Sequence, residues 1–402
     1  MKILVLNCGS SSVKYELLEA EDNAILARGE IEAIGSEGTI LVYYKGDEKT
    51  KFPIIAKDHT TAINEILKVL TSPESGTIKD KNEIAAVGHR IVHGGAYFKE
   101  PALVDEDVKK KLDDCIDIAP LHTPHHIKGI LAMEALIPEI PQVLVFDTAF
   151  HQTMPETAFM YALPYRFYEK YNIRKYGFHG ISHQYIAEQV AEISKKPAEK
   201  LKIISCHLGN GASVCAIKSG KSIDTSMGFT PLEGLVMGTR TGDMDPSIVT
   251  YIMSKELMKP IEAQSLINKQ SGLLGVSGVS SDMRIVIKEA ENGSARAQLA
   301  IDMFCYRVKK YIAAYIGVLD GCDYIVFTAG IGERSPLIRK KILTDMDYFG
   351  ITIDEKNNSA CVSCKGEISG PGSAIKVYVI PANEAGVISK ETKKLLDNFG
   401  KK

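Results

Sequence analysis

One polar turn occurs twice in this chain, about two hundred residues apart, and each copy lies between two apolar runs. The first copy spans Asn7 to Lys14, and the second spans His207 to Ala212. A short glycine-containing turn between apolar runs is typical of a β-hairpin. Aligning Gly9 with Gly209 and Ser12 with Ser213 predicts that the second turn is one residue longer than the first.

Turns of this composition are suited to binding phosphate. Glycine allows backbone N–H groups to approach an anion, and serine and asparagine side chains add further donors. A single turn of this kind is usually an ordinary hairpin. Two matched turns, together with Gly330-Ile331-Gly332 after another apolar run, predict that the chain binds the phosphates of a nucleotide.

The composition favours small-molecule chemistry. Forty-eight basic and fifty acidic residues give a net charge of -2, so no overall field attracts nucleic acid or an anionic membrane. The first apolar run is too short for a signal peptide, and no run approaches the ~20 residues that span a bilayer. We therefore expect a soluble, cytoplasmic protein with no nucleic-acid or membrane partner.

The predicted elements follow one order in both halves of the chain. In the first half, apolar periodicity predicts strands at 3–6, 13–18, 24–31, 39–44, 84–92 and 143–146, and helices at 62–70, 105–118 and 123–136. In the second half it predicts strands at 202–206, 212–217, 221–225, 324–327 and 375–380, and helices at 246–255, 261–268, 280–291, 295–319 and 383–398. The buried strand 324–327 is similar in kind to 143–146.

This order predicts an α/β protein of two related domains with a ligand cleft between them. At 402 residues, with 45% hydrophobic content, the chain is long enough for two cores. We expect the first domain to comprise 1–149, completed by a C-terminal helix at 384–402. We expect residues 150–383 to form the second domain and to bind the nucleotide.

Arginines and carboxylates stand out in otherwise apolar or glycine-rich stretches. Arg90 ends a predicted strand, and Arg240 lies in a glycine-containing loop. The planar guanidinium suits a carboxylate or a transferring phosphoryl group, although either arginine could simply be a surface charge. Asp147 follows a buried strand and Glu384 begins a helix, so both are candidate oxygen ligands for Mg²⁺.

Histidine and cysteine give weaker signals. Histidines gather in loops without the spacing of a zinc site, and His179 is the one we favour for ligand contact, because glycines flank it and Phe178 offers an apolar wall. The eight cysteines are scattered, as reduced thiols would be. Cys361 and Cys364 have metal or redox spacing, but without a second pair nearby we interpret them as incidental loop thiols.

Several long motifs of this chain resemble the acetate kinase family, within the superfamily of acetate and sugar kinases, actin and heat-shock chaperones. The resemblance covers nearly the whole chain. It rests on residues 6–14, 88–95, 145–151, 176–180, 225–234 and 327–333. The fold implied by this resemblance is a pair of domains of actin-like ATPase, or ribonuclease H-like, topology.

The resemblance also implies site residues. Metal binding falls to Asn7 and Glu384, and catalysis to Asp147, His179, Arg240 and Arg90. Acetate is expected to contact Arg90, Val92, Leu121, His122, Phe178 and Pro231. ATP is expected to contact Lys14, Ser10, Ser12, His207, Leu208, Gly209, Asn210, Gly211, Asp282, Met283, Arg284, Gly330, Ile331, Gly332, Glu333 and Arg334.

The implied reaction is the Mg²⁺-dependent transfer of a phosphoryl group between ATP and acetate, which gives acetyl phosphate and ADP. Mn²⁺ is expected to substitute for Mg²⁺. The resemblance also implies a homodimer. Acetate is already ionised at neutral pH and needs no general base. Asp147 is therefore better suited to organise Mg²⁺ or the arginines than to accept a proton. Charge neutralisation falls to Arg240, His179 and Mg²⁺.

Two other functions remain open at this stage. A propionate or butyrate kinase of the same family would use the same chemistry in a roomier pocket, and one methylene group changes binding by only ~1–3 kcal/mol. An actin-like or chaperone-like protein would use both hairpins to bind nucleotide as a conformational switch. That alternative gives no reason for Arg90, Arg240 and His179 to serve one reaction.

Overall fold

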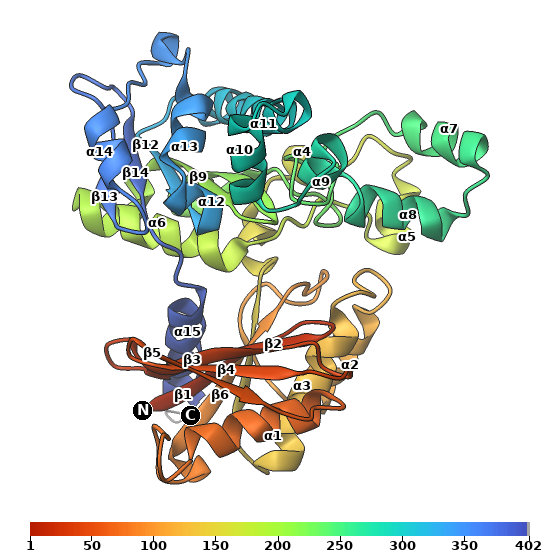
Figure 1. Cartoon of the computed structure of the whole chain (residues 1–402), viewed down its shortest axis with the longest axis vertical. Coiled ribbons are helices and arrows are strands. Elements are labelled where there is room, and N and C mark those ends of the chain that lie inside the picture. The colour runs from red at the N-terminus through yellow and green to blue at the C-terminus, as the bar shows by residue number, and fades with distance from the viewer. Residues whose placement is uncertain (400–402) are drawn as a thin grey trace. The chain divides into compact units, whose positions relative to one another are not determined.

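The computed structural model describes residues 1–399, which divide into two compact units (Figure 1). Unit 1 consists of Met1–Phe150 and the C-terminal segment that starts at Asn383. Unit 2 consists of His151–Ala382. The last three residues of the C-terminal helix expected at 384–402 lie outside the described residues.

Unit 1 is built on a mixed eight-stranded sheet in the order β5-β4-β3-β2-β1-β6-β8-β7. Its first five strands form an antiparallel meander, and β6 and β8 extend it in parallel. The strands are β1 (Lys2–Cys8), β2 (Ser12–Glu19), β3 (Ala24–Glu32), β4 (Ile40–Lys45), β5 (Glu48–Pro53), β6 (Ile84–Ile91), β7 (Ala102–Leu103) and β8 (Gln142–Phe146). The helices are α1 (His59–Leu70), α2 (Glu106–Asp114), α3 (Thr123–Leu136) and α15 (Glu384–Phe399).

Helices cover both faces of this sheet. On one face, Leu4, Leu6 and Cys8 of β1 share a core with apolar residues of α1, and a Cβ on Gly129 of α3 would lie 2.6 Å from the Cys8 sulfur. On the other face, a Cβ on Gly88 of β6 would lie 2.6 Å from Ile388 of α15. Figure 1 shows α15, in dark blue, beside the sheet of unit 1.

Unit 2 is built on a six-stranded sheet in the order β11-β10-β9-β12-β14-β13. The strands are β9 (Lys202–Leu208), β10 (Ala212–Lys218), β11 (Lys221–Thr225), β12 (Tyr324–Thr328), β13 (Gly366–Glu367) and β14 (Lys376–Val379). The helices are α4 (Glu156–Phe159), α5 (Arg166–Tyr171), α6 (Gly180–Ser194), α7 (Ser247–Glu256), α8 (Pro260–Lys269), α9 (Gly272–Ser277), α10 (Met283–Glu291), α11 (Ala295–Leu319), α12 (Ala329–Arg334), α13 (Pro336–Leu343) and α14 (Glu355–Ala360). Six consecutive residues of β9, from Ile203 to Leu208, are buried, as expected for a strand covered on both faces.

The two sheets share a central arrangement. The order β3-β2-β1-β6-β8 in unit 1 matches β11-β10-β9-β12-β14 in unit 2, with three antiparallel strands followed by two parallel ones. This position makes β12 the counterpart of β6, and β14 the counterpart of β8. Strands 324–327 and 143–146 are alike in kind, since both are short and almost wholly buried, but they do not hold equivalent positions. Local sequence does not tell which neighbour a strand has.

The hairpin comparison is correct in kind but wrong in its offset. Cys8 pairs with Val13 in the first hairpin, whereas Leu208 pairs with Ala212 in the second. The second turn is thus one residue shorter, not longer. The alignment of Ser12 with Ser213 misled, because the strand pairing makes Lys14 the counterpart of Ser213.

Most predicted elements are confirmed within a few residues, and α3 and α11 match at both ends. Helix α2 ends at Asp114, before the predicted residue 118, and α10 begins at Met283 after Asp282 caps it. Helix α6 was not predicted. Short 3-10 helices at Lys81–Glu83, Ala149–Thr153, Ala198–Lys200 and Asp347–Phe349 complete the described elements.

Candidate active site

In unit 1, Arg90 and Asp147 form a bidentate ion pair. The Arg90 Nε and Nη2 atoms donate to the two Asp147 carboxylate oxygens, at 3.2 and 2.7 Å. Arg90 lies near the end of β6, Asp147 follows β8, and these strands pair in parallel, so their carboxyl ends meet at one edge of the sheet. The Asp147 N–H also donates to the Ile91 carbonyl oxygen at 2.9 Å.

Glu384 adds a second carboxylate to this ion pair. One of its oxygens lies 3.5 Å from Arg90 Nε. Burial alone lowers the pKa of Arg90, but the negative charges of Asp147 and Glu384 outweigh burial and raise that pKa. The guanidinium therefore stays charged at any working pH.

Asn7 and Lys14 point to the face of the sheet on which α15 packs. Side chains alternate along a strand, and Leu6 and Cys8 face α1, so Asn7 faces the α15 side, as Gly88 does. Lys14 pairs with Asn7 across the hairpin, and its exposed Nζ lies 3.9 Å from a Glu30 oxygen.

The tip of the first hairpin carries Ser10 and Ser12 and is held by local bonds. The Gly9 N–H donates to the Ser12 carbonyl oxygen at 2.8 Å. The His59 Nε2 atom of α1 hydrogen-bonds to the Gly9 carbonyl oxygen at 2.8 Å. His59, which the sequence did not single out, thus anchors a turn expected to meet phosphate.

In unit 2, α6 brings histidines against the second hairpin. His179 immediately precedes α6 with a positive φ of 58°, and its Nδ1 hydrogen-bonds to Ser213 Oγ at 2.9 Å. One helical turn later, His183 hydrogen-bonds to both Ser213 and Ser205, each at 2.8 Å. The His179 ring also stacks on His207, with ring centroids 4.1 Å apart.

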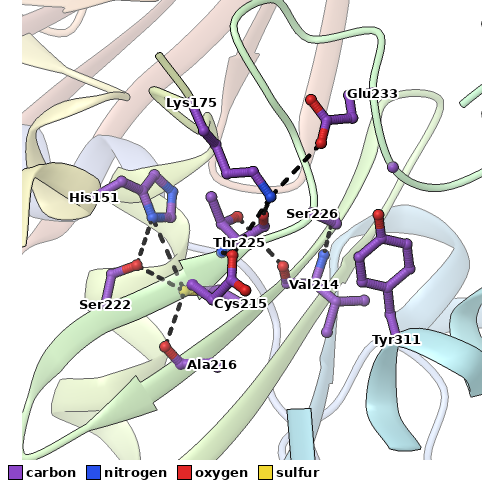
Figure 2. Close-up of polar contacts among 12 residues, drawn as sticks. His151, Lys175, Val214, Cys215, Ala216, Ser222, Thr225, Ser226, Glu233 and Tyr311 are labelled. Carbon is purple, nitrogen blue, oxygen red and sulfur yellow. Dashed lines mark hydrogen bonds and ion pairs between the residues drawn. The ribbon is translucent and has the colours of Figure 1, made fainter. Parts of the chain in front are cut away.

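Beneath this network, His151 fixes the segment that precedes α6. Figure 2 shows the His151 ring beside Ser222 and Cys215 of the sheet, and Nδ1 hydrogen-bonds to Ser222 Oγ at 2.8 Å. Its Nε2 hydrogen-bonds to the Phe178 carbonyl oxygen at 3.0 Å. Burial lowers the pKa of His151 to about 4, so this ring is neutral at pH 7.

Arg240 and His179 converge beside the second hairpin tip. A Cβ built on Gly211 would lie 3.5 Å from His179 Nε2 and 3.6 Å from Arg240 Nη1. The Arg240 Nη1 also donates to the Pro231 carbonyl oxygen at 3.2 Å. Burial lowers the pKa of Arg240 from its ordinary value, which is far above neutrality. A guanidinium donor and an imidazole nitrogen therefore lie next to the glycine at this turn.

The loop that carries Pro231 is held by partly buried polar contacts. Figure 2 shows Lys175 reaching toward Glu233 and Thr225, and its Nζ donates to the Thr225 carbonyl oxygen at 3.0 Å. The same Nζ lies 3.5 Å from an Asp224 carboxylate oxygen. The Tyr161 hydroxyl donates to the Glu233 carboxylate and accepts from the Phe229 N–H at 2.8 Å. These contacts hold the loop whose Pro231 carbonyl oxygen accepts from Arg240.

The expected adenosine-binding residues lie at the start of α10. Asp282 caps the helix by accepting from the Arg284 N–H at 2.9 Å. The exposed Arg284 side chain forms an ion pair with the same carboxylate, with Nη2 to Oδ2 at 2.6 Å. Met283 is buried. Asp282 is thus already occupied by Arg284 in this state.

The far wall of the nucleotide pocket was expected in a loop ahead of a helix, but its residues belong to α12 itself. They are Gly330, Ile331, Gly332, Glu333 and Arg334. Glu333 is buried, and its carboxylate accepts from the Ala382 N–H at 2.8 Å. Its side chain therefore has a structural contact. Gly330 and Arg334 are exposed.

The apolar residues expected around acetate divide between the units. Val92, Leu121 and His122 belong to unit 1, whereas Phe178 and Pro231 belong to unit 2. Phe178 is buried, Val92, His122 and Pro231 are half-buried, and Leu121 is 54% exposed. Phe178 is the most deeply buried residue of this set.

The metal implied by the sequence fits the residues of unit 1. Among residues 1–399, no group of three or more His, Cys, Asp and Glu side chains is arranged to hold a metal ion. Mg²⁺ usually binds one or two carboxylates and takes its remaining ligands from water and phosphate. The Asn7 amide and the Glu384 carboxylate, both on the α15 side of the sheet, match that small donor set.

Comparisons with known proteins identify the family. The model of the acetokinase family matches residues 2–390. An acetate kinase of Caldicellulosiruptor saccharolyticus is 54% identical over 398 residues, which cover 99% of this chain and 100% of that protein. The chain belongs to the acetokinase family.

Solved structures of the acetokinase family share its fold. An acetate kinase of Porphyromonas gingivalis has a TM-score of 0.94 and 47% identity, covering 98% of this chain and 99% of that one. A propionate kinase of Francisella tularensis has a TM-score of 0.92 and 43% identity, with the same coverage. The predicted α/β fold of actin-like ATPase type is therefore confirmed.

Sequence reasoning missed part of this candidate site. Ser182, His183, Ser205 and Ser213 form the network around His179 and His207. One signal was available, because His179 and His183 are four residues apart and share one face if the segment is helical. The serines gave no such signal, since buried strands often contain one.

Proposed function

We propose that this protein is an acetate kinase, which transfers the γ-phosphoryl group of ATP to acetate reversibly and directly in line, giving acetyl phosphate and ADP. The observation that carries the proposal is the convergence of His179 and Arg240 beside Gly211, at the tip of a hairpin suited to phosphate. An anion attacks an anion in this reaction, so neutralising charge is the main catalytic task.

Asp147 organises the site and does not act as a base. Both of its oxygens accept hydrogen bonds from Arg90, and acetate is already ionised at neutral pH. Because Asp147 occupies the Nε and Nη2 edge of Arg90, acetate is expected to meet the other edge, formed by Nη1 and Nη2. We assign Val92, Leu121, Phe178 and Pro231 to its methyl group, and His122 as a further contact of acetate.

His179 and Arg240 stabilise the phosphoryl group in transit. Burial holds the pKa of His183 well below its ordinary value, so His183 is neutral and carries one N–H. If that N–H is on Nε2, it donates to Ser213, the Ser213 hydroxyl donates to His179 Nδ1, and His179 Nε2 carries a hydrogen. The chain of bonds thereby supplies a donor on the side that faces Gly211 and Arg240.

Nucleotide and metal are held by the remaining residues. We assign the phosphates to Ser10, Ser12, Lys14 and 207–211, and the adenosine to 282–284 and 330–334. When bound, Mg²⁺ neutralises phosphate charge, and Asn7 and Glu384 would hold it. We expect Mn²⁺ to substitute for it.

Detection of acetyl phosphate as its hydroxamate tests the function. The protein is incubated with ATP, Mg²⁺, acetate and hydroxylamine, and a control omits acetate. We expect hydroxamate only with all components present. No product at high acetate concentration would contradict the proposal.

Propionate is the second candidate substrate, because a propionate kinase is 43% identical to this chain. One methylene changes binding by ~1–3 kcal/mol, so the two acids differ at most by about two orders of magnitude in kcat/KM. We expect acetate to have the highest kcat/KM in a series with propionate and butyrate. A higher value for propionate would reassign the substrate.

We further propose a cytoplasmic homodimer. None of the described helices is long and apolar enough to cross a membrane. Helix α7 has no buried residue, and large apolar side chains on α7 and nearby are exposed, among them Tyr251, Leu257 and Ile261. Exposed apolar surface of this kind favours a protein partner. Sedimentation equilibrium tests the assembly, and a monomer at micromolar concentration would contradict it.

A further inference from the structure

Cys361 and Cys364 lie much closer than incidental thiols would. Their sulfur atoms are 3.0 Å apart, and the Cys361 thiol donates to the Cys364 carbonyl oxygen at 3.1 Å. Ser363, between them, adopts a positive φ of 55°, which turns the chain back on itself. A disulfide bond is about 2.05 Å long, so the two sulfurs need to approach by only about 1 Å.

The surroundings give the two thiols different roles. Cys364 is the one exposed cysteine among the eight, all of which lie within the described residues, whereas Cys361 is buried. Burial and the contact with Cys364 raise the pKa of Cys361 to about 11. Cys364 is therefore the thiol that an external reagent reaches first, and Cys361 is placed to attack afterwards.

The pair is joined to α12 by hydrogen bonds from a fully buried arginine. Arg339 Nη2 donates to the Cys361 carbonyl oxygen at 2.7 Å, and Nη1 donates to the Gly332 and Glu333 carbonyl oxygens at 2.8 and 3.1 Å. The Ser363 N–H donates to the same Glu333 carbonyl at 3.1 Å. A backbone movement at the cysteines therefore acts on the residues we assign to the nucleotide.

We propose that Cys361 and Cys364 form a dithiol site for small-molecule disulfides, which oxidise it to an intramolecular disulfide and thereby weaken nucleotide binding at α12. The first half of this proposal is independent of the enzyme's function, and the second half rests on the proposed function.

The chemical step is a pair of thiol–disulfide exchanges. The Cys364 thiol loses its proton to water, and the thiolate attacks one sulfur of the reagent, which releases one thiolate and leaves a mixed disulfide. The Cys361 sulfur then attacks the Cys364 sulfur, releases the second reagent thiolate and loses its own proton. Two electrons pass from the cysteines to the reagent.

Ellman's reagent, an aromatic disulfide, tests the first half on the native protein. We expect two equivalents of coloured thiolate per chain, with a protein product that carries no adduct and has lost two hydrogens. The Cys361→Ser variant should release one equivalent and retain the adduct, because the second attack is lost. The Cys364→Ser variant should release no coloured thiolate on the time scale of the wild-type reaction.

Cys322→Ser is the matched control. Cys322 is half-buried, and burial raises its pKa to about 12, so this variant should behave as the wild type. If the wild-type protein released one equivalent of coloured thiolate and kept a stable adduct, the dithiol site would be overturned. Formation of an intramolecular disulfide in the Cys364→Ser variant would overturn it as well.

Kinetics of the oxidised and reduced protein test the second half. We expect oxidation to raise the KM for ATP about three- to tenfold, with a smaller change in the KM for acetate, and reduction to reverse it. An unchanged KM for ATP in protein whose mass shows the disulfide would overturn the coupling. Protein without acetate kinase activity in either state would instead contradict the proposed function, and the mass result would still stand.

Discussion

Asn7 is the residue on which the metal assignment depends most. Its side chain lies on the α15 side of the sheet, where Glu384 begins that helix. We expect Asn7→Ala to raise the Mg²⁺ concentration for half-maximal rate about tenfold, with a smaller change in the KM for acetate. Titration of the rate with Mg²⁺ measures both effects. A larger change in the KM for acetate would mean that the first hairpin has been misinterpreted.

His183 tests whether a buried network orients His179. Its bonds to Ser205 and Ser213 hold the serine that meets His179 Nδ1. We expect His183→Asn to lower kcat about tenfold, with little change in the KM for ATP, since it acts through another residue. When His179→Ala is already present, adding His183→Asn should lower kcat almost no further. Additive losses would contradict this role.

The residues of the site were predictable one at a time, but their partners were not. Motifs singled out Arg90 and Asp147 separately, yet their bidentate pair exists because β6 and β8 are neighbours, and 57 positions separate the two residues. His179 was also singled out, whereas its partner Ser213 was not. Local sequence shows which groups can do chemistry, whereas strand order decides which of them meet.

Helix and strand prediction succeeded where the chain carries end signals. Helix α3 has proline in its first turn, and Ser294 caps α11 by accepting from the Ala297 N–H. Helix α6 starts instead with glycine after His179, whose side chain makes no capping bond. Without a capping residue the sequence offers no start signal, so this helix was missed.

The packing of α15 on the sheet depends on Gly88. A Cβ there would lie 2.6 Å from Ile388 and 2.8 Å from Thr392. We expect Gly88→Ala to lower the free energy of unfolding by about 1–3 kcal/mol, because α15 must move. Gly317→Ala on α11 is the matched control, since no atom lies within 4 Å of its added Cβ, and alanine should stabilise that helix by up to about 1 kcal/mol. Urea unfolding that ranks the two variants in the opposite order would contradict this packing.

At the scale of the whole molecule, buried neutral histidines should make stability depend on pH. Burial lowers the pKa of His89 and His151 to about 4, and lowers that of His126 and His183 well below its ordinary value. Between pH 6.5 and 4 the unfolded chain binds protons at these histidines and the folded chain does not. Their stabilising effect is complete above pH 6.5 and declines as the pH falls.

Within that window, each such histidine lowers the free energy of unfolding by up to about 1.4 kcal/mol for each unit by which the pH falls. The urea midpoint should therefore fall between pH 7 and pH 5. The fall should be smaller in His89→Gln, which removes one titrating group but keeps a side chain able to meet Gln142. A midpoint that is constant across this range would contradict the prediction.

The central claim is that the phosphoryl group passes to acetate with Arg240 as a stabilising donor. Phosphorus NMR follows ATP, acetyl phosphate, ADP and free phosphate in one mixture containing Mg²⁺ and acetate. Wild-type protein should form acetyl phosphate in step with ADP. Arg240→Ala should lose most of this turnover, at least about a hundredfold, while still binding ATP. Release of free phosphate in place of acetyl phosphate by the wild type, or near wild-type turnover by Arg240→Ala, would contradict the account.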